Sequence, residues 1–282
     1  MVITHLSYPY LYCCGILIGK TGSSYLIILS TVIIYNLIIP MSYLPLLSAL
    51  LPAIALLGYI YWRDRKSPEP IGQLLKATAL SVLAIPLTVA IVYPLQWIGV
   101  IPEEYTSIFG AIYDAFMSAA IPEELSKLLL LWLFLRKNPY FDERMDGIVY
   151  AVCVSLGFAG LENVLYVVLD EDWASVAISR AIFSVPGHFC FGVMMGYFYS
   201  LAKFEPQHRT RYSALALVVP VVAHGIYDSL LFIMQVYIPT WLETTLLLGF
   251  LIFCFYLWKW AAKSIKKHTQ INHLLINNTK RV

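Results

Sequence analysis

Residues 110–135 read GAIYDAFMSAAIPEELSKLLLLWLFL, an apolar run interrupted near its middle by two adjacent acids and a lysine. The run is long enough to cross a bilayer core of roughly 30 Å, which needs about 20 helical residues. A charged side chain at mid-bilayer costs about 2.5–3.5 kcal/mol, so Glu123, Glu124 and Lys127 must face one another, other polar groups or water. This segment therefore predicts a membrane-embedded helix bundle with a polar interior.

The composition of the whole chain is typical of a membrane protein. Of its 282 residues, 60% are apolar and 13% are charged, whereas soluble domains have about 45–50% and about 25%. These proportions exclude an ordinary soluble domain and make the lipid bilayer the expected surroundings. No run of lysine and arginine is interleaved with aromatic residues as a nucleic-acid groove requires, so we expect no nucleic-acid partner.

Apolar runs bounded by charge clusters, glycine or proline predict seven membrane-spanning helices. We therefore predict an all-α fold, a polytopic transmembrane helix bundle of seven or eight spans with a buried polar site. The eighth span would lie near residues 24–39, within an N-terminal extension of residues 1–42. Residues 43–262 would form the functional domain, and residues 263–282 a basic polar tail. The seven spans lie near residues 43–62, 74–98, 110–135, 147–169, 174–201, 212–236 and 240–260.

The basic residues predict the orientation, because cytoplasmic loops of membrane proteins carry an excess of lysine and arginine. One set of alternate loops, together with the C-terminal tail, holds most of the 19 lysines and arginines. The opposite loops hold acidic charges such as Glu104, Asp170 and Glu243. We expect a multi-pass protein of the cell (plasma) membrane with its C-terminus in the cytoplasm.

Nine ionisable side chains remain inside the predicted spans once the loops are set aside. Residues four apart share a helix face, which pairs Glu123 with Lys127 and His224 with Asp228. A carboxylate at this spacing can accept a hydrogen bond from the imidazole and fix its tautomer. Four helices would thus offer polar groups to one interior. The nine residues are Asp114, Glu123, Glu124, Lys127, Glu162, Arg180, His188, His224 and Asp228.

The charges of these nine groups do not balance. With neutral histidines they comprise five carboxylates and two cations, an excess of three negative charges in a low-dielectric interior. Shared protons or protonated histidines would relieve the excess and point to acid–base catalysis or proton transport. A bound cation would relieve it equally well and point to a metalloenzyme or an ion carrier. The charges alone leave these alternatives open.

Four short motifs on four successive polar spans resemble the pattern of the PrsW family of intramembrane proteases, relatives of the type II CAAX-processing endopeptidases. They are Glu123-Glu124-x-x-Lys127, Phe158-x-x-x-Glu162, the single His188 and His224-x-x-x-Asp228. Two further segments look similar to PrsW. They are Asp64-Arg65-Lys66-Ser67-Pro68-Glu69-Pro70 after the first of the seven spans and Asp146-Gly147-Ile148-Val149-Tyr150 at the start of the fourth. The similarity runs from about residue 43 to 260, so residues 43–262 would be an intramembrane protease-like domain.

The resemblance implies proteolysis of membrane-anchored proteins, with bacterial anti-sigma factors as the known type of target. Transferred by motif, Glu123 and Glu124 would include the base that activates water. Glu162 and His188 would complete the water or metal site. His224 and Asp228 would orient the scissile carbonyl or stabilise the oxyanion. The catalytic candidates are therefore Glu123, Glu124, Glu162, His188, His224 and Asp228.

Further residues would support this site or bind a metal. The supporting candidates are Lys127, Asn163 and Arg180. A divalent metal such as zinc is an optional cofactor, because the family resemblance implies either a glutamate-type or a metal-type enzyme. Its candidate ligands are Glu123, Glu162, His188 and His224.

The favoured hypothesis is a membrane-embedded endopeptidase that hydrolyses a peptide bond of a single-span membrane protein by glutamate- and histidine-assisted attack of water. The sequence has no Ser/His/Asp order and no His-Glu-x-x-His helix, which disfavours serine and zincin mechanisms. One alternative is a proton- or cation-coupled transporter, which also needs mid-membrane carboxylates and histidines. Another is a non-catalytic protein that binds membrane helices through small-residue faces.

Overall fold

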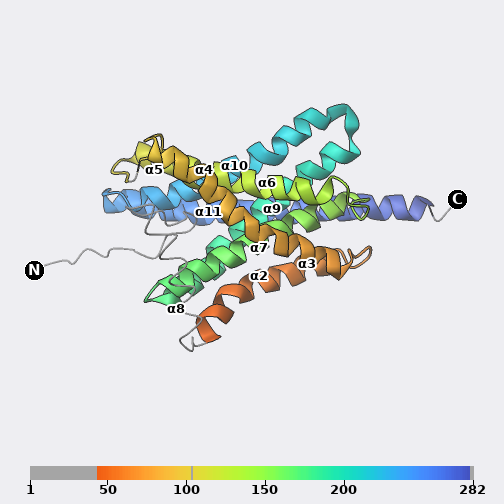
Figure 1. Ribbon diagram of the computed structural model, residues 1–282, viewed down its shortest axis with the longest axis horizontal. Helices are drawn as coiled ribbons and strands as arrows, with labels where there is room; N and C mark the ends of the chain where they lie inside the picture. The colour runs from red at the N-terminus through yellow and green to blue at the C-terminus, as the bar shows by residue number, and fades with distance from the viewer. Residues whose placement is uncertain (1–42, 103, 280–282) are drawn as a thin grey trace, which may run out of the picture.

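The computed structural model of the protein describes residues 43–102 and 104–279, with side chains as far as Ile271. In these residues it is a bundle of α-helices without any β-strand, which confirms the predicted fold class (Figure 1). Short segments of other helix types join some of the α-helices. They are the 3₁₀ segments η1 (Ser81–Leu83) and η4 (Pro206–His208) and the π-helical segments η2 (Ala115–Ala120) and η3 (Arg180–Ser184). The α-helices are α2 (Tyr43–Arg63), α3 (Ile71–Leu80), α4 (Ala84–Trp97), α5 (Ile108–Asp114), α6 (Ile121–Leu135), α7 (Arg144–Leu169), α8 (Trp173–Ser179), α9 (Val185–Phe204), α10 (Arg209–Ile233) and α11 (Thr240–Thr279).

Six helical runs in the described residues are long and apolar enough to cross a membrane. The seventh predicted span is also helical from Ile108 to Leu135, through α5, η2 and α6. This segment is not among the six apolar runs because it contains several charged residues. The predicted eighth span, near residues 24–39, lies outside the described residues. The protein is therefore a multi-pass membrane protein, while the number of seven or eight spans stays a prediction. The six runs are Tyr43–Arg63, Ile71–Trp97, Arg144–Leu169, Trp173–Phe204, Pro206–Ile233 and Thr240–Ile271.

Helix α7 lies at the centre of the bundle, where it packs most extensively on α9 and also on α2 and α3 (Figure 1). Most of its residues are buried, on all sides of the helix. A helix that is apolar all round is expected in such a central position. The few polar groups on α7, among them Ser155, Glu162 and Asn163, are therefore held inside the protein.

Glycines bring the backbones of α7 and α9 close together. A Cβ atom on Gly196 would meet the carbonyl oxygen of Gly147 and would lie 2.6 Å from Cα of Ile148. A Cβ atom on Gly192 would lie 2.8 Å from Cβ of Ser155. Such short contacts exclude any larger residue without a shift of the helices, as expected where small residues line a membrane helix interface. This close packing sets the distance between the polar groups of the two helices.

Two π-helical segments stand directly before two prolines. Segment η2 ends two residues before Pro122, and η3 ends two residues before Pro186. Proline lacks an N–H group and its ring clashes with the carbonyl four residues earlier, so a helix that continues through it must widen or bend. Single π turns of this kind are frequent at functional sites. These turns, which were not predicted from the sequence, lie just before Glu123 and His188.

Helix α11 continues without a break through the predicted boundary at residues 262–263, as far as Thr279. The expected tail is therefore helical from residue 263 to Thr279. Ala261, Ser264, Ile265 and His268 recur every three or four residues and are buried, so they form the face that packs onto the bundle. Nδ1 of His268 lies 3.0 Å from the carbonyl oxygen of Arg144 at the start of α7.

Candidate active site

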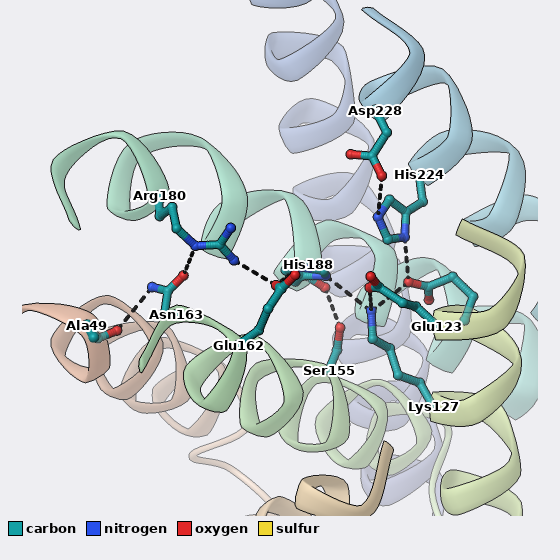
Figure 2. A network of polar contacts seen from close by, with 11 residues as sticks. Ala49, Glu123, Lys127, Ser155, Glu162, Asn163, Arg180, His188, His224 and Asp228 are labelled. Carbon is teal, nitrogen blue, oxygen red and sulfur yellow. Dashed lines mark hydrogen bonds and ion pairs between the residues drawn. The ribbon is translucent and has the colours of Figure 1, made fainter. Parts of the chain in front are cut away.

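The predicted site residues come from five segments and converge in the interior of the bundle (Figure 2). Each of them is at most 1% exposed. The first turn of α6 carries the two glutamates and, one turn later, the lysine, directly after Pro122. The others are Glu162 and Asn163 on α7, Arg180 at the start of η3, His188 on α9, and His224 and Asp228 on α10.

The ammonium group of Lys127 lies at the centre of this network. Its Nζ atom is 3.2 Å from Oε2 of Glu123, 2.9 Å from Oε1 of Glu124 and 3.2 Å from Nδ1 of His188. It also lies 4.0 Å from the ring centre of Phe158, a cation–π arrangement that partly offsets desolvation. Two carboxylates and an imidazole thus point their acceptor atoms at one cation.

A second part of the network runs from His188 to α2. Nε2 of His188 lies 3.0 Å from Oε2 of Glu162, which also accepts a 2.7 Å hydrogen bond from Nη2 of Arg180. Nε of Arg180 donates to Oδ1 of Asn163 at 2.5 Å. The amide of Asn163 donates in turn to the carbonyl oxygen of Ala49 at 3.1 Å. The chain of contacts fixes the orientation of the imidazole from the side away from Lys127.

The imidazole of His224 lies between two carboxylates. Its Nδ1 is 3.0 Å from Oε1 of Glu124, and its Nε2 is 3.2 Å from Oδ2 of Asp228. The ring of Phe191 stacks on it at 4.7 Å between centroids, with an interplanar angle of 17°. His224 and His188 are also neighbours, with ring centroids 5.5 Å apart. The two histidines therefore belong to one site.

The structure brings eight of the nine predicted ionisable residues into this network. The ninth, Asp114, lies apart on α5, where its carboxylate accepts a hydrogen bond from Ser118. Sequence reasoning missed Ser155, whose hydroxyl donates to the carbonyl oxygen of His188 at 2.7 Å. It also missed the packing role of Phe191. Helical spacing offered a signal for both, because Ser155 precedes Glu162 by two turns and Phe191 follows His188 by one.

The electrostatics of the network fit an additional cation. Four buried carboxylates face two permanent cations, an excess of two negative charges when both histidines are neutral. Among the described residues, Oε1 of Glu123, Oε2 of Glu124 and Oε1 of Glu162 have no hydrogen-bond partner. Buried charges and buried polar atoms without partners are costly. One divalent cation would neutralise the excess, and water or a cation would satisfy the oxygens.

The donor atoms also have a suitable arrangement for a metal. Glu123, Glu124 and His188 each offer one ligand atom, and the three atoms lie within 4.8 Å of one another. Glu123 and His188, two of the four metal ligands predicted from the sequence, are in this group. The other two contact it from outside, since Glu162 meets the second nitrogen of His188 and His224 meets Glu124. A carboxylate on the far nitrogen of a ligating histidine is a common feature of metal sites.

A cavity of about 290 Å³ lies beside the network. Gly187 and Tyr227 line it and are the chain neighbours of His188 and Asp228. Ile182 and Trp258 line it too and are 57% and 40% exposed, so the cavity reaches the lipid-facing surface. Residues of η3, α9, α10 and α11 surround it.

Fold and site together define a polytopic membrane protein with acids, histidines and a lysine clustered inside the bundle, a chemistry suited to hydrolysis. Residues 69–258 match the sequence profile of the PrsW family of intramembrane metalloproteases. This match covers more than half of the chain, so the chain belongs to the PrsW family and is an intramembrane protease, a hydrolase.

Individual relatives agree with this assignment. The chain is 33% identical over 226 residues to Protease PrsW of Bacillus subtilis (strain 168), which covers 80% of this chain and 95% of the relative. It is 37% identical over 180 residues to Protease PrsW of Geobacillus kaustophilus (strain HTA426), 64% of this chain and 76% of the relative. It is 38% identical over 192 residues to Protease PrsW of Oceanobacillus iheyensis, 67% and 83% respectively.

No solved structure matches this chain. The family assignment confirms the predicted resemblance and the predicted class of enzyme. It gives no support to the alternative of a proton- or cation-coupled transporter. The roles of the individual site residues stay predictions.

Proposed function

We propose that this protease cleaves single-span membrane proteins within the bilayer, by attack of a water molecule that buried glutamate and histidine side chains activate. The observation that carries the proposal is the group formed by Glu123, Glu124 and His188, whose donor atoms converge in the interior. Bacterial anti-sigma factors are the substrate class that the family resemblance implies, and we include them in the proposal.

Glu123 is the proposed general base. Its Oε2 accepts a hydrogen bond from the Lys127 ammonium, and its Oε1 has no hydrogen-bond partner among the described residues. Glu124 is more heavily engaged, because the same oxygen faces Lys127 and His224. A base must have an oxygen available for the proton of water. Each glutamate has one such oxygen. Glu123 is the proposed base because fewer donors hold its other oxygen, and Glu124 would bind the water or a metal.

Glu162, Asn163 and Arg180 act as positioning residues in this proposal. Their contacts hold one nitrogen of His188 and leave the other facing the Lys127 ammonium, which also contacts the two glutamates. An imidazole that is fixed in this way keeps one tautomer and one orientation. Until substrate and water enter, the positive charge of Lys127 would offset the free-energy cost of burying two adjacent carboxylates.

His224 and Asp228 would act on the scissile carbonyl. Asp228 lies beside one ring nitrogen of His224, and Glu124 lies beside the other. Once substrate replaces one of these carboxylates beside the ring, a protonated imidazole can donate a hydrogen bond to the oxyanion and a proton to the leaving amine. Phe191 would hold the ring in place by stacking.

A metal fits the donors described above. Glu123, Glu124 and His188 would hold it, and it would displace the ammonium of Lys127 from their centre. A divalent metal bound there would supply Lewis-acid chemistry, which makes water more acidic and polarises a carbonyl. Zinc is the proposed ion, because it accepts mixed carboxylate and imidazole ligands.

The cavity beside Gly187 and Tyr227 is the proposed access route for substrate. A single-span helix could reach it from the lipid without crossing a polar surface.

We also propose that the protein resides in the plasma membrane with its C-terminus in the cytoplasm, because the alternate loops differ in basic charge. The proposed division keeps residues 43–262 as the protease domain, 1–42 as an extension and 263–282 as a tail.

The test is cleavage of a tagged single-span substrate after co-reconstitution with the purified full chain in liposomes. Glu123→Gln and His188→Ala should each lower the cleavage rate by about 10²- to 10⁴-fold, the usual contribution of acid–base groups. Asp114→Asn is the matched control. Asp114 lies on the same helical run but outside the network, so this variant should cleave at the wild-type rate. Full cleavage by both Glu123→Gln and Glu124→Gln would refute the mechanism.

A further inference from the structure

Two segments that the active site does not use pack together at one end of the bundle. One is the connection from Asp64 to Pro70 between α2 and α3, and the other leads from Asp142 into the first turns of α7. The hydroxyl of Tyr150 donates a hydrogen bond to Glu69. The hydroxyl of Ser67 donates to Oε1 of Glu143 at 3.1 Å. The two segments that resemble the family outside the four catalytic motifs are therefore in direct contact.

Carboxylate oxygens converge where these segments meet. Oδ2 of Asp146 accepts hydrogen bonds from the backbone N–H groups of Asp142, at 2.9 Å, and Glu143, at 2.5 Å, which fixes the start of α7. Glu69, Asp142 and Asp146 each offer one oxygen, and the three atoms lie within 4.8 Å of one another. Oxygens that share a Ca²⁺ ion at about 2.3–2.6 Å lie at most about 5 Å apart. The spacing suits a shared cation.

Asp64 provides an independent indication of a ligand. It is 5% exposed, and its Oδ2 has no hydrogen-bond partner among the described residues. It lies in the same connection as Glu69, and the charges of Glu69 and Glu143 act on it. Its carboxyl group is thus buried beside the cluster with one oxygen unsatisfied, a costly arrangement that a cation would relieve.

The charges around the cluster are predominantly negative. Five carboxyl groups lie close enough there for their charges to act on one another, and the charge of Lys203 acts on Asp142 and Asp146. The Lys203 ammonium donates to the carbonyl oxygen of Phe141. Asp142 is exposed, so an ion can reach the cluster from water. The five carboxyl groups belong to Asp64, Glu69, Asp142, Glu143 and Asp146.

We propose that Glu69, Asp142 and Asp146, with Asp64 beside them, bind a divalent cation of the Mg²⁺ or Ca²⁺ type at a site separate from the catalytic centre. All donors are oxygens, which hard cations prefer, and neither histidine nor cysteine takes part. The ion would tie the α2–α3 connection to the start of α7. Because α7 carries Glu162, the cation would stabilise the helix that orients His188.

Terbium luminescence tests the proposal with the purified full chain in nanodiscs. The protein is first treated with a chelator, which is then removed. Added Tb³⁺ should give a saturable luminescence signal, sensitised by Tyr150, and Ca²⁺ or Mg²⁺ should lower this signal by displacing Tb³⁺. Asp142→Asn should weaken the affinity by about 10- to 100-fold, the usual effect of losing a group that supports a metal site. Ca²⁺ or Mg²⁺ should also raise the thermal unfolding midpoint of wild type but not of Asp142→Asn.

Two further variants separate this site from other sources of signal. Asp172→Asn changes an exposed aspartate away from the cluster and should bind Tb³⁺ as wild type does. Glu124→Gln alters the catalytic network and should also keep the signal. The absence of saturable binding to wild type, or equal affinity in Asp142→Asn and wild type, would overturn the proposal and indicate carboxyl groups held by shared protons. Glu69→Gln provides a second ligand variant, and wild-type affinity there would contradict the proposal equally.

Discussion

Nζ of Lys127 lies 3.2 Å from Nδ1 of His188. An ammonium group can only donate, so Nδ1 is the acceptor and the ring proton resides on Nε2, where it faces Glu162. The lone pair of Nδ1 is the one that a metal would use. The ammonium therefore occupies the position in which a metal would meet Glu123, Glu124 and His188, and the two cations should compete.

Replacing Lys127 by methionine tests this competition. Lys127→Met leaves two buried carboxylates without their cation and should lower the free energy of unfolding by about 3–5 kcal/mol. The same change removes the competitor, so Zn²⁺ should raise the thermal unfolding midpoint of the variant more than that of wild type. Thermal unfolding with a zinc series measures both effects. Equal zinc-dependent shifts in the two proteins would show that the ammonium and the metal do not share a position.

Asp228→Asn should separate catalysis from folding. The amide has nearly the same shape as the carboxylate but cannot stabilise a protonated imidazole at His224, 3.2 Å away. We expect cleavage to fall by about 10²- to 10⁴-fold, with a thermal unfolding midpoint close to that of wild type. Ser229→Ala, on the next position of α10, is the control, because its hydroxyl bonds only to the carbonyl oxygen of Gly225. Undiminished cleavage by Asp228→Asn would remove Asp228 from the mechanism.

Gly196→Ala should force α9 away from α7. The added methyl group would lie 2.6 Å from Cα of Ile148 and 2.8 Å from Cβ of Ala151, too close for an ordinary contact. We expect a loss of about 1–3 kcal/mol in the free energy of unfolding, as for other overpacked sites. Cleavage should fall as well, because Glu162 and His188 lie on the two helices that separate. Gly249→Ala on α11 has nothing within 4 Å and should change neither quantity appreciably.

Helical spacing predicts many of the residues that form this site, but it cannot predict contacts that depend on how separate helices pack together. The four-residue interval placed Glu123 with Lys127 and His224 with Asp228, and the cost of isolated charges in a bilayer required them to meet. The same reasoning could not show that Asn163 bonds to the carbonyl oxygen of Ala49, since that contact joins segments far apart in the chain.

Backbone geometry was the other feature that spacing could not supply. The prediction of helical spans near residues 110–135 and 174–201 included no π turn, but the chain forms one before Pro122 and one before Pro186. Each π turn shifts the following residues around the helix axis relative to a regular α-helix. The direction of Glu123 and His188 therefore depends on a local distortion that follows from proline only when the helix continues through it.

Cys254→Trp tests the proposed access route. Cys254 lines the 290 Å³ cavity on α11, and an indole there would fill much of the space through which substrate would approach. We expect slower cleavage of the single-span substrate, with the largest effect at low substrate density. Phe255→Trp is the control, because Phe255 is 64% exposed on the same helix. Equal cleavage by the two variants would place the route elsewhere.

The ion pair between Arg144 and Glu205 should make stability depend on pH in acid. Nη1 of Arg144 donates to Oε1 of Glu205 at 2.7 Å, which joins the start of α7 to the end of α9. This hydrogen bond lowers the pKa of Glu205 below its usual value of 4.5. A carboxyl group whose pKa is lower in the folded state stabilises the protein above its unfolded-state pKa and loses that effect as the pH falls through the folded-state pKa.

Glu205→Gln should therefore be less stable than wild type at pH 7, by at most about 1 kcal/mol because the pair is partly exposed. The difference should narrow below about pH 4.5 and close once Glu205 is protonated in both states. High salt should also reduce it, since screening weakens a partly exposed pair. Denaturant unfolding of both proteins in detergent from pH 7 to pH 3 measures the difference, with Glu171→Gln, at an exposed loop position, as the control. A gap that stays constant over this range would mean that the glutamate stabilises the α7–α9 junction through its packing, not through its charge.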